Sequence, residues 1–231
     1  MPSGKKVEVL IPAYNEEERI SETVSAILNV PEIDGVLVVD DGSTDDTAIK
    51  ARLAGARVVS LPVNSGKGEA LNRGVKELTA EIIVFLDADL GPSAAEVKRL
   101  VDPVISGAAD MTIARFPKSK RKGGFGLVKR LAGEGIRRHT GLVMESPLSG
   151  QRAMTRRVAE KTAPFATGFG VEVSMTITAA KQGFRILEVP VNMRHKETGR
   201  NWKGFIHRGK QFWHVALVLT GISRRKRGAG C

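Results

Sequence analysis

Short apolar runs alternate with amphipathic stretches along the first half of the chain. The apolar runs are rich in β-branched residues, as buried strands are, and the stretches between them repeat with the period of a helix. This alternation predicts an α/β fold with a doubly wound, mostly parallel sheet and helices on both faces. The expected strands are 7–11, 35–39, 57–60, 82–86 and 111–114, and the expected helices are 17–28, 44–54, 68–78 and 94–106.

The second half of the chain has a less regular pattern. Residues 117–126 contain four lysines or arginines, three glycines and no apolar run, which predicts a loop. We expect one domain over 1–231, with two functional halves at 7–115 and 126–222. The later expected elements are a basic helix at 127–139, a strand before Ala153, a helix at 172–182, a strand at 186–189 and a basic amphipathic helix near 202–219.

Composition adds constraints on size and compartment. A chain of 231 residues with 42% hydrophobic residues has enough apolar surface for a core. Its one cysteine, Cys231, excludes a disulfide framework and fits a reducing compartment, so the cytoplasm is the expected location. The apolar run at 212–222 is shorter than the roughly 20 residues that span a bilayer.

The net charge of +11 is concentrated in a few basic clusters. A solvated surface, an anionic lipid surface and phosphorylated substrates all fit such clusters. Aromatic residues are only 5% of the chain and form no base-stacking motif, which argues against nucleic acid as a partner. The aromatic and basic residues of 202–219 favour either a core-packed helix or peripheral contact with the inner face of a membrane. A homodimer is left open.

Carboxylates follow one of the expected strands. Asp87 and Asp89 come directly after the strand at 82–86, at the edge where parallel sheets bind ligands. Side chains two positions apart in extended backbone point to the same side. The pair therefore predicts a Mg²⁺ or Mn²⁺ site that also binds diphosphate, with helix capping as the alternative.

Two further polar positions suggest nucleotide contacts. Asp41 follows the strand at 35–39, where an acid can accept hydrogen bonds from a base or a ribose. Lys67 lies between two glycines at the start of an expected helix, which favours phosphate contact over a plain turn.

Four motifs in this order resemble the nucleotide-sugar half of family-2 glycosyltransferases, which have the GT-A fold. They are IPAYNEE (11–17), VVDDGSTDDT (38–47), GKGEAL (66–71) and DAD (87–89). The resemblance implies that residues 7–115 bind a nucleotide diphosphate sugar. The base and ribose contacts that it implies are Pro12, Ala13, Tyr14, Glu16 and Asp41.

The second half resembles glucosyl-3-phosphoglycerate synthases and, more loosely, polyprenyl-phosphate sugar transferases. The motifs are SPLSGQ (146–151), GFGVEV (168–173), VPV (189–191) and RH (194–195). This resemblance implies that His195 is a metal ligand beside Asp89, whereas a histidine in a basic loop is otherwise a surface residue. The acceptor contacts that it implies are Ser146, Leu148, Ser149 and Gly150.

One position departs from the synthase pattern. The synthases have a Gly-Arg pair ahead of the acceptor loop, whereas this chain has Val143-Met144-Glu145. An acid at this place is expected to repel phosphoglycerate. The acceptor is therefore left open between a phosphorylated small molecule and a polyprenyl phosphate.

The expected activity is metal-dependent transfer of a hexose from a sugar nucleotide of the UDP-glucose or GDP-mannose type. The metal at Asp89, with Lys67, is expected to offset the charge that develops on the leaving diphosphate. Glu172 is a candidate for taking the acceptor proton, with helix capping as the alternative. The rival hypotheses are a nucleotidyltransferase, which would have a glycine-rich loop after the first strand, and a non-catalytic basic binding module.

Overall fold

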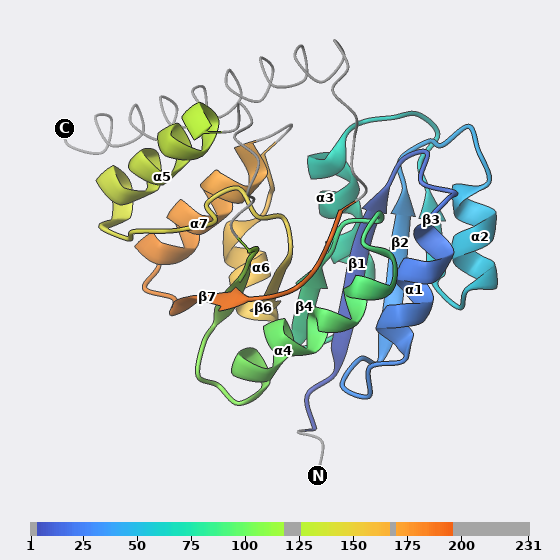
Figure 1. The fold of residues 1–231 in the computed structure, drawn as a ribbon, viewed down its shortest axis with the longest axis horizontal. Helices are drawn as coiled ribbons and strands as arrows, with labels where there is room; N and C mark the ends of the chain where they lie inside the picture. The colour runs from blue at the N-terminus through green and yellow to red at the C-terminus, as the bar shows by residue number, and fades with distance from the viewer. Residues whose placement is uncertain (1–3, 118–125, 167–169, 196–231) are drawn as a thin grey trace.

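The computed structural model describes residues 4–117, 126–166 and 170–195, which form a sheet with helices on both faces (Figure 1). The sheet has seven strands among these residues, in the order β3-β2-β1-β4-β6-β5-β7. The strands are β1 (Val7–Ala13), β2 (Gly35–Asp40), β3 (Arg57–Ser60), β4 (Ile82–Phe85), β5 (Met111–Arg115), β6 (Arg152–Thr155) and β7 (Ile186–Pro190).

The sheet is mostly parallel, as the sequence predicts. β6 is the exception, because it lies antiparallel between β4 and β5. The strand expected before Ala153 instead spans Arg152–Thr155. β6 therefore runs from the edge where β4 ends, and this direction decides which loop meets which at the candidate site.

The helices also match the expected pattern, with local differences. The expected helix at 44–54 begins later, at Thr47, because the Asp45 carboxylate accepts a hydrogen bond from the Thr47 N–H (3.0 Å). α6 was not expected, and the helix expected at 94–106 begins with a 3₁₀ segment, η1. The helices are α1 (Ile20–Leu28), α2 (Thr47–Leu53), α3 (Lys67–Glu77), η1 (Gly91–Glu96), α4 (Val97–Ile105), α5 (Gly126–Thr140), α6 (Arg156–Thr162) and α7 (Val171–Lys181).

The core has two apolar layers, one on each face of the sheet. In β1, Val9 and Ile11 face the layer formed with α1, α2 and α4, whereas Leu10 faces the layer formed with α3, α6 and α7. This split follows from the alternation of side chains along a strand. α5 packs outside α7 through a smaller cluster that includes Val128 and Ile177.

Some expectations fall outside the described residues. They include most of the basic loop at 117–126 and the amphipathic helix near 202–219. Membrane contact through that helix and a homodimer remain predictions. Within the described ranges, every helix is too short or too polar to cross a bilayer.

The packing around Gly74 in α3 leaves no room for a side chain, so a substitution by alanine should destabilise the protein here but not at a more open glycine. A Cβ on Gly74 would lie 2.3 Å from Leu10 Cδ1 and 3.0 Å from Val39 Cγ2, inside a fully packed layer. We expect Gly74→Ala to lower the free energy of unfolding by about 1–3 kcal/mol, the usual cost of overpacking. Chemical denaturation measures this change.

Gly133→Ala is the matched control for that variant. Its Cβ would lie 3.9 Å from its nearest neighbour, Pro147 Cγ, so the added methyl fits. Because alanine favours a helix interior by about 0.5–1 kcal/mol over glycine, this variant should be more stable than the parent. Equal effects of the two substitutions would contradict the packing argument.

Candidate active site

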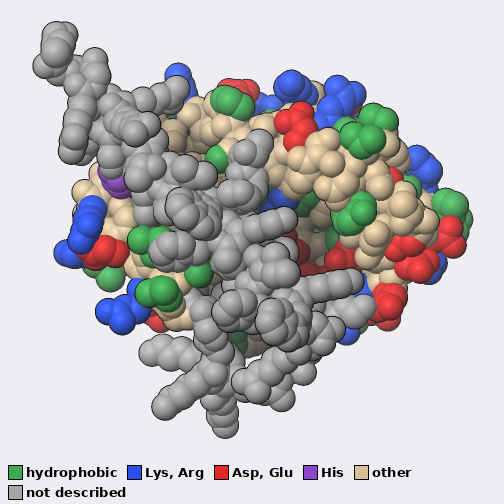
Figure 2. Space-filling model, turned by 90° about the horizontal axis from the view of Figure 1, so that it is seen from above, with side chains coloured by type: hydrophobic (Ala, Val, Ile, Leu, Met, Phe, Trp, Pro, Cys, Tyr) green, Lys and Arg blue, Asp and Glu red, His purple; other side chains and the backbone are tan. Residues whose placement is uncertain are grey.

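The polar residues of interest lie at the edge of the sheet formed by the carboxyl ends of the parallel strands. Figure 2 views this edge and shows acidic side chains in a hollow near its middle. Loops after β1, β2, β4 and β7 meet here, along with the segment that precedes β6. Ligands of doubly wound sheets bind at this edge.

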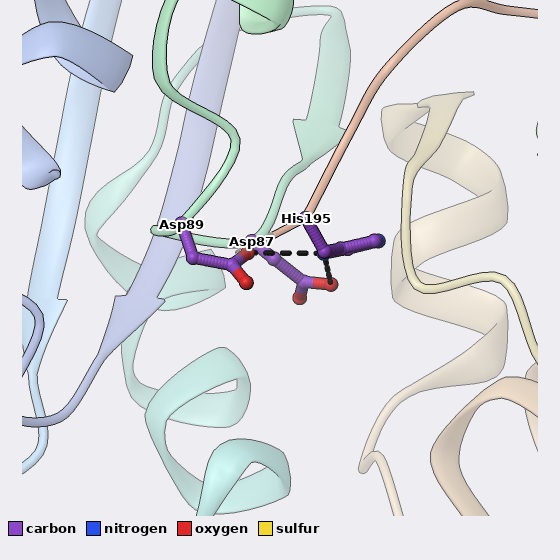
Figure 3. A group of neighbouring side chains, drawn as sticks. All are labelled: Asp87, Asp89 and His195. Atoms are coloured by element: carbon purple, nitrogen blue, oxygen red, sulfur yellow. Dashed lines mark hydrogen bonds and ion pairs between the residues drawn. The ribbon is translucent and has the colours of Figure 1, made fainter. Parts of the chain in front are cut away.

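Asp87, Asp89 and His195 form a compact group of metal-ligating side chains (Figure 3). The two aspartates follow β4, and His195 lies beyond the end of β7. His195 Nδ1 is 3.0 Å from Asp89 Oδ1 and 3.9 Å from Asp87 Oδ2. One ligand atom from each residue lies within 4.8 Å of the others.

The donor set of this group fits a divalent metal. Carboxylate oxygens suit Mg²⁺ and Mn²⁺, and an imidazole nitrogen is a further ligand for Mn²⁺. Helix capping does not explain Asp89, because η1 begins at Gly91 without a side-chain cap. The sequence predicted a metal site at Asp87 and Asp89, the resemblance implied His195 as a further ligand, and the structure brings the three side chains together.

The surroundings of the group shift the pKa values of His195 and Asp87. Burial opposes a proton on the imidazole, but the hydrogen bond to Asp89 and the charges of both aspartates raise the pKa of His195. Burial likewise opposes the charge on Asp87, but nearby Lys67 and His195 lower the pKa of this carboxyl. A cation at this place therefore meets an Asp87 carboxylate that is already ionised.

Lys67 bridges two carboxylates that come from different halves of the chain. Its Nζ lies 2.8 Å from Asp87 Oδ1 and 3.4 Å from Glu172 Oε1. Burial opposes the ammonium charge, but attraction to Asp87 and Glu172 outweighs it and raises the pKa of Lys67. Glu172 is not the helix cap, because α7 begins after Gly170. The two candidate catalytic regions are thus joined by one cation.

The acceptor loop predicted from the sequence packs directly against this bridge. A Cβ on Gly150 would lie 2.6 Å from Lys67 Nζ and 3.5 Å from both carboxylate oxygens of Asp87. Gln151 Nε2 donates to Asp87 Oδ2, and the Ser149 hydroxyl donates to Gln151 Oε1 (3.3 Å). Ser149 and Gly150 therefore lie at the site.

The other two predicted acceptor residues lie around the same loop. The Ser146 N–H donates to Glu188 Oε1 (2.6 Å). Leu148 packs against the apolar cluster between α5 and α7. Their contacts with an acceptor stay predictions.

The residues expected to contact the base lie on the opposite side of the metal group, at the ends of β1 and β2. Tyr14 is exposed, Ala13 is buried, and Pro12 is half-buried. The Glu16 N–H donates to Thr47 Oγ1 (2.8 Å), which ties this loop to the start of α2.

Asp41 holds the loop that leads to Lys67. It is 4% exposed, and its two carboxylate oxygens accept hydrogen bonds from the N–H groups of Ser65 (2.8 Å) and Gly66 (2.7 Å). Each carboxylate oxygen can accept a second bond. The base or ribose contact of Asp41 thus stays a prediction, whereas its role in positioning the loop before α3 is visible.

Three residues at the site were missed by the sequence reasoning. Gln151 orients Asp87, and Arg152 is a buried cation that donates to Ser149 O and to Thr176 Oγ1 (both 2.9 Å). Glu188 accepts the N–H groups of two consecutive residues ahead of the acceptor loop. An acid within the otherwise apolar β7 was the signal available for Glu188.

Removal of the imidazole tests the metal group. We expect His195→Ala to weaken Mn²⁺ binding by at least about tenfold, since loss of even a supporting group has that effect. Isothermal titration calorimetry measures the dissociation constant. His139→Ala, at the end of α5, is the control, and an equal loss in both variants would contradict the assignment.

Comparisons with known proteins agree with this geometry. The sequence model of the family described as Glycosyl transferase family 2 matches residues 8–169. Glucosyl-3-phosphoglycerate synthase of Mycobacterium tuberculosis is 35% identical over 199 residues, covering 76% of this chain and 61% of the synthase. Glycosyltransferase AglJ of Haloferax volcanii is 32% identical over 204 residues, covering 86% of this chain and 66% of the relative.

The similarity extends to solved structures. A crystal structure of the M. tuberculosis synthase in complex with Mn²⁺, uridine-diphosphate and phosphoglyceric acid has a TM-score of 0.78 and 30% identity, covering 94% of this chain and 78% of that one. The chain spans 61% of the length of the curated synthase that it matches. Because the family model matches most of the chain, this protein belongs to glycosyl transferase family 2 and has the GT-A fold.

Proposed function

We propose that this protein transfers a hexose from a nucleotide diphosphate sugar to a phosphorylated acceptor with the help of Mg²⁺ or Mn²⁺. UDP-glucose is the favoured donor, because the similar synthase was crystallised with uridine-diphosphate-glucose and Mn²⁺. A GDP-mannose type of donor is the alternative. Family membership argues against both a nucleotidyltransferase and a non-catalytic binding module.

The observation that carries this proposal is the joining of the metal group to the acceptor loop through Lys67. The ammonium of Lys67 contacts Asp87 of the metal group, faces Glu172 and lies against Gly150. A donor and an acceptor must meet within bonding distance for transfer. The metal group and the acceptor loop lie side by side at this edge, which supports a site where both would bind.

Departure of the nucleoside diphosphate builds negative charge on the leaving phosphate. A metal held by Asp87, Asp89 and His195 would supply Lewis-acid stabilisation of that charge. Lys67 is fixed beside Asp87 in its charged form, so it adds a preorganised cation without reorganisation during the reaction.

Glu172 is the candidate for receiving the proton of an acceptor hydroxyl. Its side chain is 13% exposed and lies 3.4 Å from Lys67. Lys67 in turn lies against Gly150, so Glu172 is near the loop that would hold the acceptor. If the acceptor is a polyprenyl phosphate, it is already an anion and this role of Glu172 is not needed.

Glu145 is a weaker obstacle to an anionic acceptor than the sequence suggested. Its carboxylate lies 2.7 Å from Arg115 Nη1, so its charge is paired. A small phosphorylated acid of the phosphoglycerate type therefore becomes the favoured acceptor, with polyprenyl phosphate as the alternative.

Thermal-shift measurements with Mn²⁺ and UDP, GDP or their sugars test the donor. Product analysis with 3-phosphoglycerate and with a polyprenyl phosphate then tests the acceptor. Metal-dependent stabilisation by a nucleotide together with transfer to one acceptor supports the proposal. The absence of any nucleotide response would overturn it.

Asp89→Ala should abolish transfer while leaving the fold intact. Loss of a metal ligand removes several kcal/mol of stabilisation, so we expect kcat to fall at least about 100-fold. The side chain is 20% exposed and lies outside the strands, so the melting temperature should change little. Full activity of this variant after removal of metal with a chelator would contradict the assignment of the metal site.

Gly150→Ala should reduce transfer without a matching loss of stability. The new methyl would meet Lys67 Nζ, the end of a flexible side chain, so the ammonium can shift while the backbone stays in place. Displacing it removes one preorganised charge, and we expect kcat to fall at least about tenfold.

A double variant tests whether that loss acts through Lys67. If it does, Gly150→Ala should have little further effect in a Lys67→Met background. Additive losses in kcat would show that Gly150 acts by another route. The melting temperatures of all three variants control for unfolding.

A further inference from the structure

A cavity lies beside the metal group, at the ends of two neighbouring strands. Its volume is about 260 Å³, and its walls are residues 115–117 at the end of β5 and 190–192 at the end of β7, with Arg99 and Glu145. β5 and β7 are parallel and pair at Arg115 and Pro190, so the cavity opens at the same sheet edge as the metal group. Arg99 is paired with Glu96 (2.9 Å) and Arg115 with Glu145 (2.7 Å), so an anion would bind here by taking the place of a carboxylate.

Arg115 has an exchangeable partner in this cavity. Its Nη1 donates to Glu145 Oε1 at 2.7 Å, and the two side chains are 38% and 54% exposed. Exposed pairs of this kind shift an equilibrium by less than about fivefold. A phosphate carries more charge than a carboxylate and offers more acceptor atoms to a guanidinium. It can therefore replace Glu145 at little cost.

The backbone of Glu145 is held independently of its side chain. Glu188 accepts the N–H of Glu145 at 2.8 Å and the N–H of Ser146 at 2.6 Å. The carboxylate of Glu145 can therefore rotate away from Arg115 while the start of the acceptor loop stays in place. This separation allows an exchange of partners without rearrangement of the loop.

The cavity is also coupled to the metal group through an aromatic contact. Phe116 lines the cavity, and its ring centroid lies 5.2 Å from that of His195 at an interplanar angle of 39°. On the other side, Glu145 leads directly into the loop that packs against Lys67 through Gly150. An anion bound at Arg115 thus lies next to both parts of the active site.

We propose that this cavity is the anion subsite for the acceptor, in which Arg115 exchanges Glu145 for a phosphate group. The proposal rests on the proposed function for its biological ligand, but phosphate binding itself does not require turnover. The carboxylate of Glu145 competes with an incoming anion for the guanidinium of Arg115, and weakly binding anions do not displace it. Glu145 and Arg115 together therefore set the acceptor specificity.

Phosphate titration of the full chain at constant ionic strength tests the subsite. We expect Arg115→Gln to weaken binding of inorganic phosphate by about tenfold, and Glu145→Gln to strengthen it by up to about fivefold. Because the chain has a net charge of +11, charge removal alone changes phosphate attraction. Arg137→Gln and Glu134→Gln, which break a similar surface pair in α5, control for that effect.

A double variant separates the subsite from general attraction. The gain from Glu145→Gln should disappear in an Arg115→Gln background, because Glu145 competes only for that guanidinium. Effects that match the α5 pair in size, or that add in the double variant, would overturn the proposal. Unchanged melting temperatures exclude loss of fold as the cause.

Two further titrations identify the source of the phosphate group. The affinities of 3-phosphoglycerate and of a polyprenyl phosphate in detergent micelles are measured for the parent protein and for Arg115→Gln. At least one of the two ligands should bind more weakly to the variant. If neither does, the cavity does not serve the acceptor.

In transfer assays, Arg115→Gln should raise the KM for the acceptor but not for the nucleotide sugar. Phosphate binding without any transfer would instead reject the proposed function and keep the subsite.

Discussion

The ammonium group of Lys67 is the contact on which the geometry of the site depends. It lies between Asp87, which follows β4, and Glu172, which lies in the first turn of α7. Ions as close as these attract strongly away from bulk water, but removing them from water is costly. The shared cation therefore stabilises both carboxylates, and Gln151 and His195 add to this effect at Asp87. Lys67 thereby ties the nucleotide-binding half to the acceptor half.

A buried cation, Arg152, lies near this bridge and holds the acceptor loop. Arg152 is 1% exposed, and burial lowers its pKa to about 10, while Glu172 and Glu188 oppose that shift. Its guanidinium joins Ser149 to Thr176, and the Thr176 hydroxyl donates to the carbonyl of Glu172. The loop and the start of α7 are thus linked through one network, in which the charges of Glu172 and Glu188 balance the buried cation.

The strands and the metal pair were predictable because their signals are local. Apolar runs mark β1, β2 and β4, and Asp87 and Asp89 follow the last of these in sequence. The missed features join distant positions. Neither the antiparallel β6 nor the pair of Arg115 with Glu145 has a local pattern, since both arise from strand order. His195 was identified as a ligand only through the resemblance, because a basic loop alone indicates a surface residue.

The direction of β6 explains why the acceptor loop meets the metal group. In a parallel sheet the segment before a strand lies at the opposite edge from the segment after its neighbour. Because β6 is antiparallel to β4, with Phe85 paired to Arg152, the residues before β6 lie beside the residues after β4. Gly150 consequently faces Asp87. A register shift of one residue would bury the wrong side chains of β6, so the packing of the core also fixes the distance between acceptor loop and metal group.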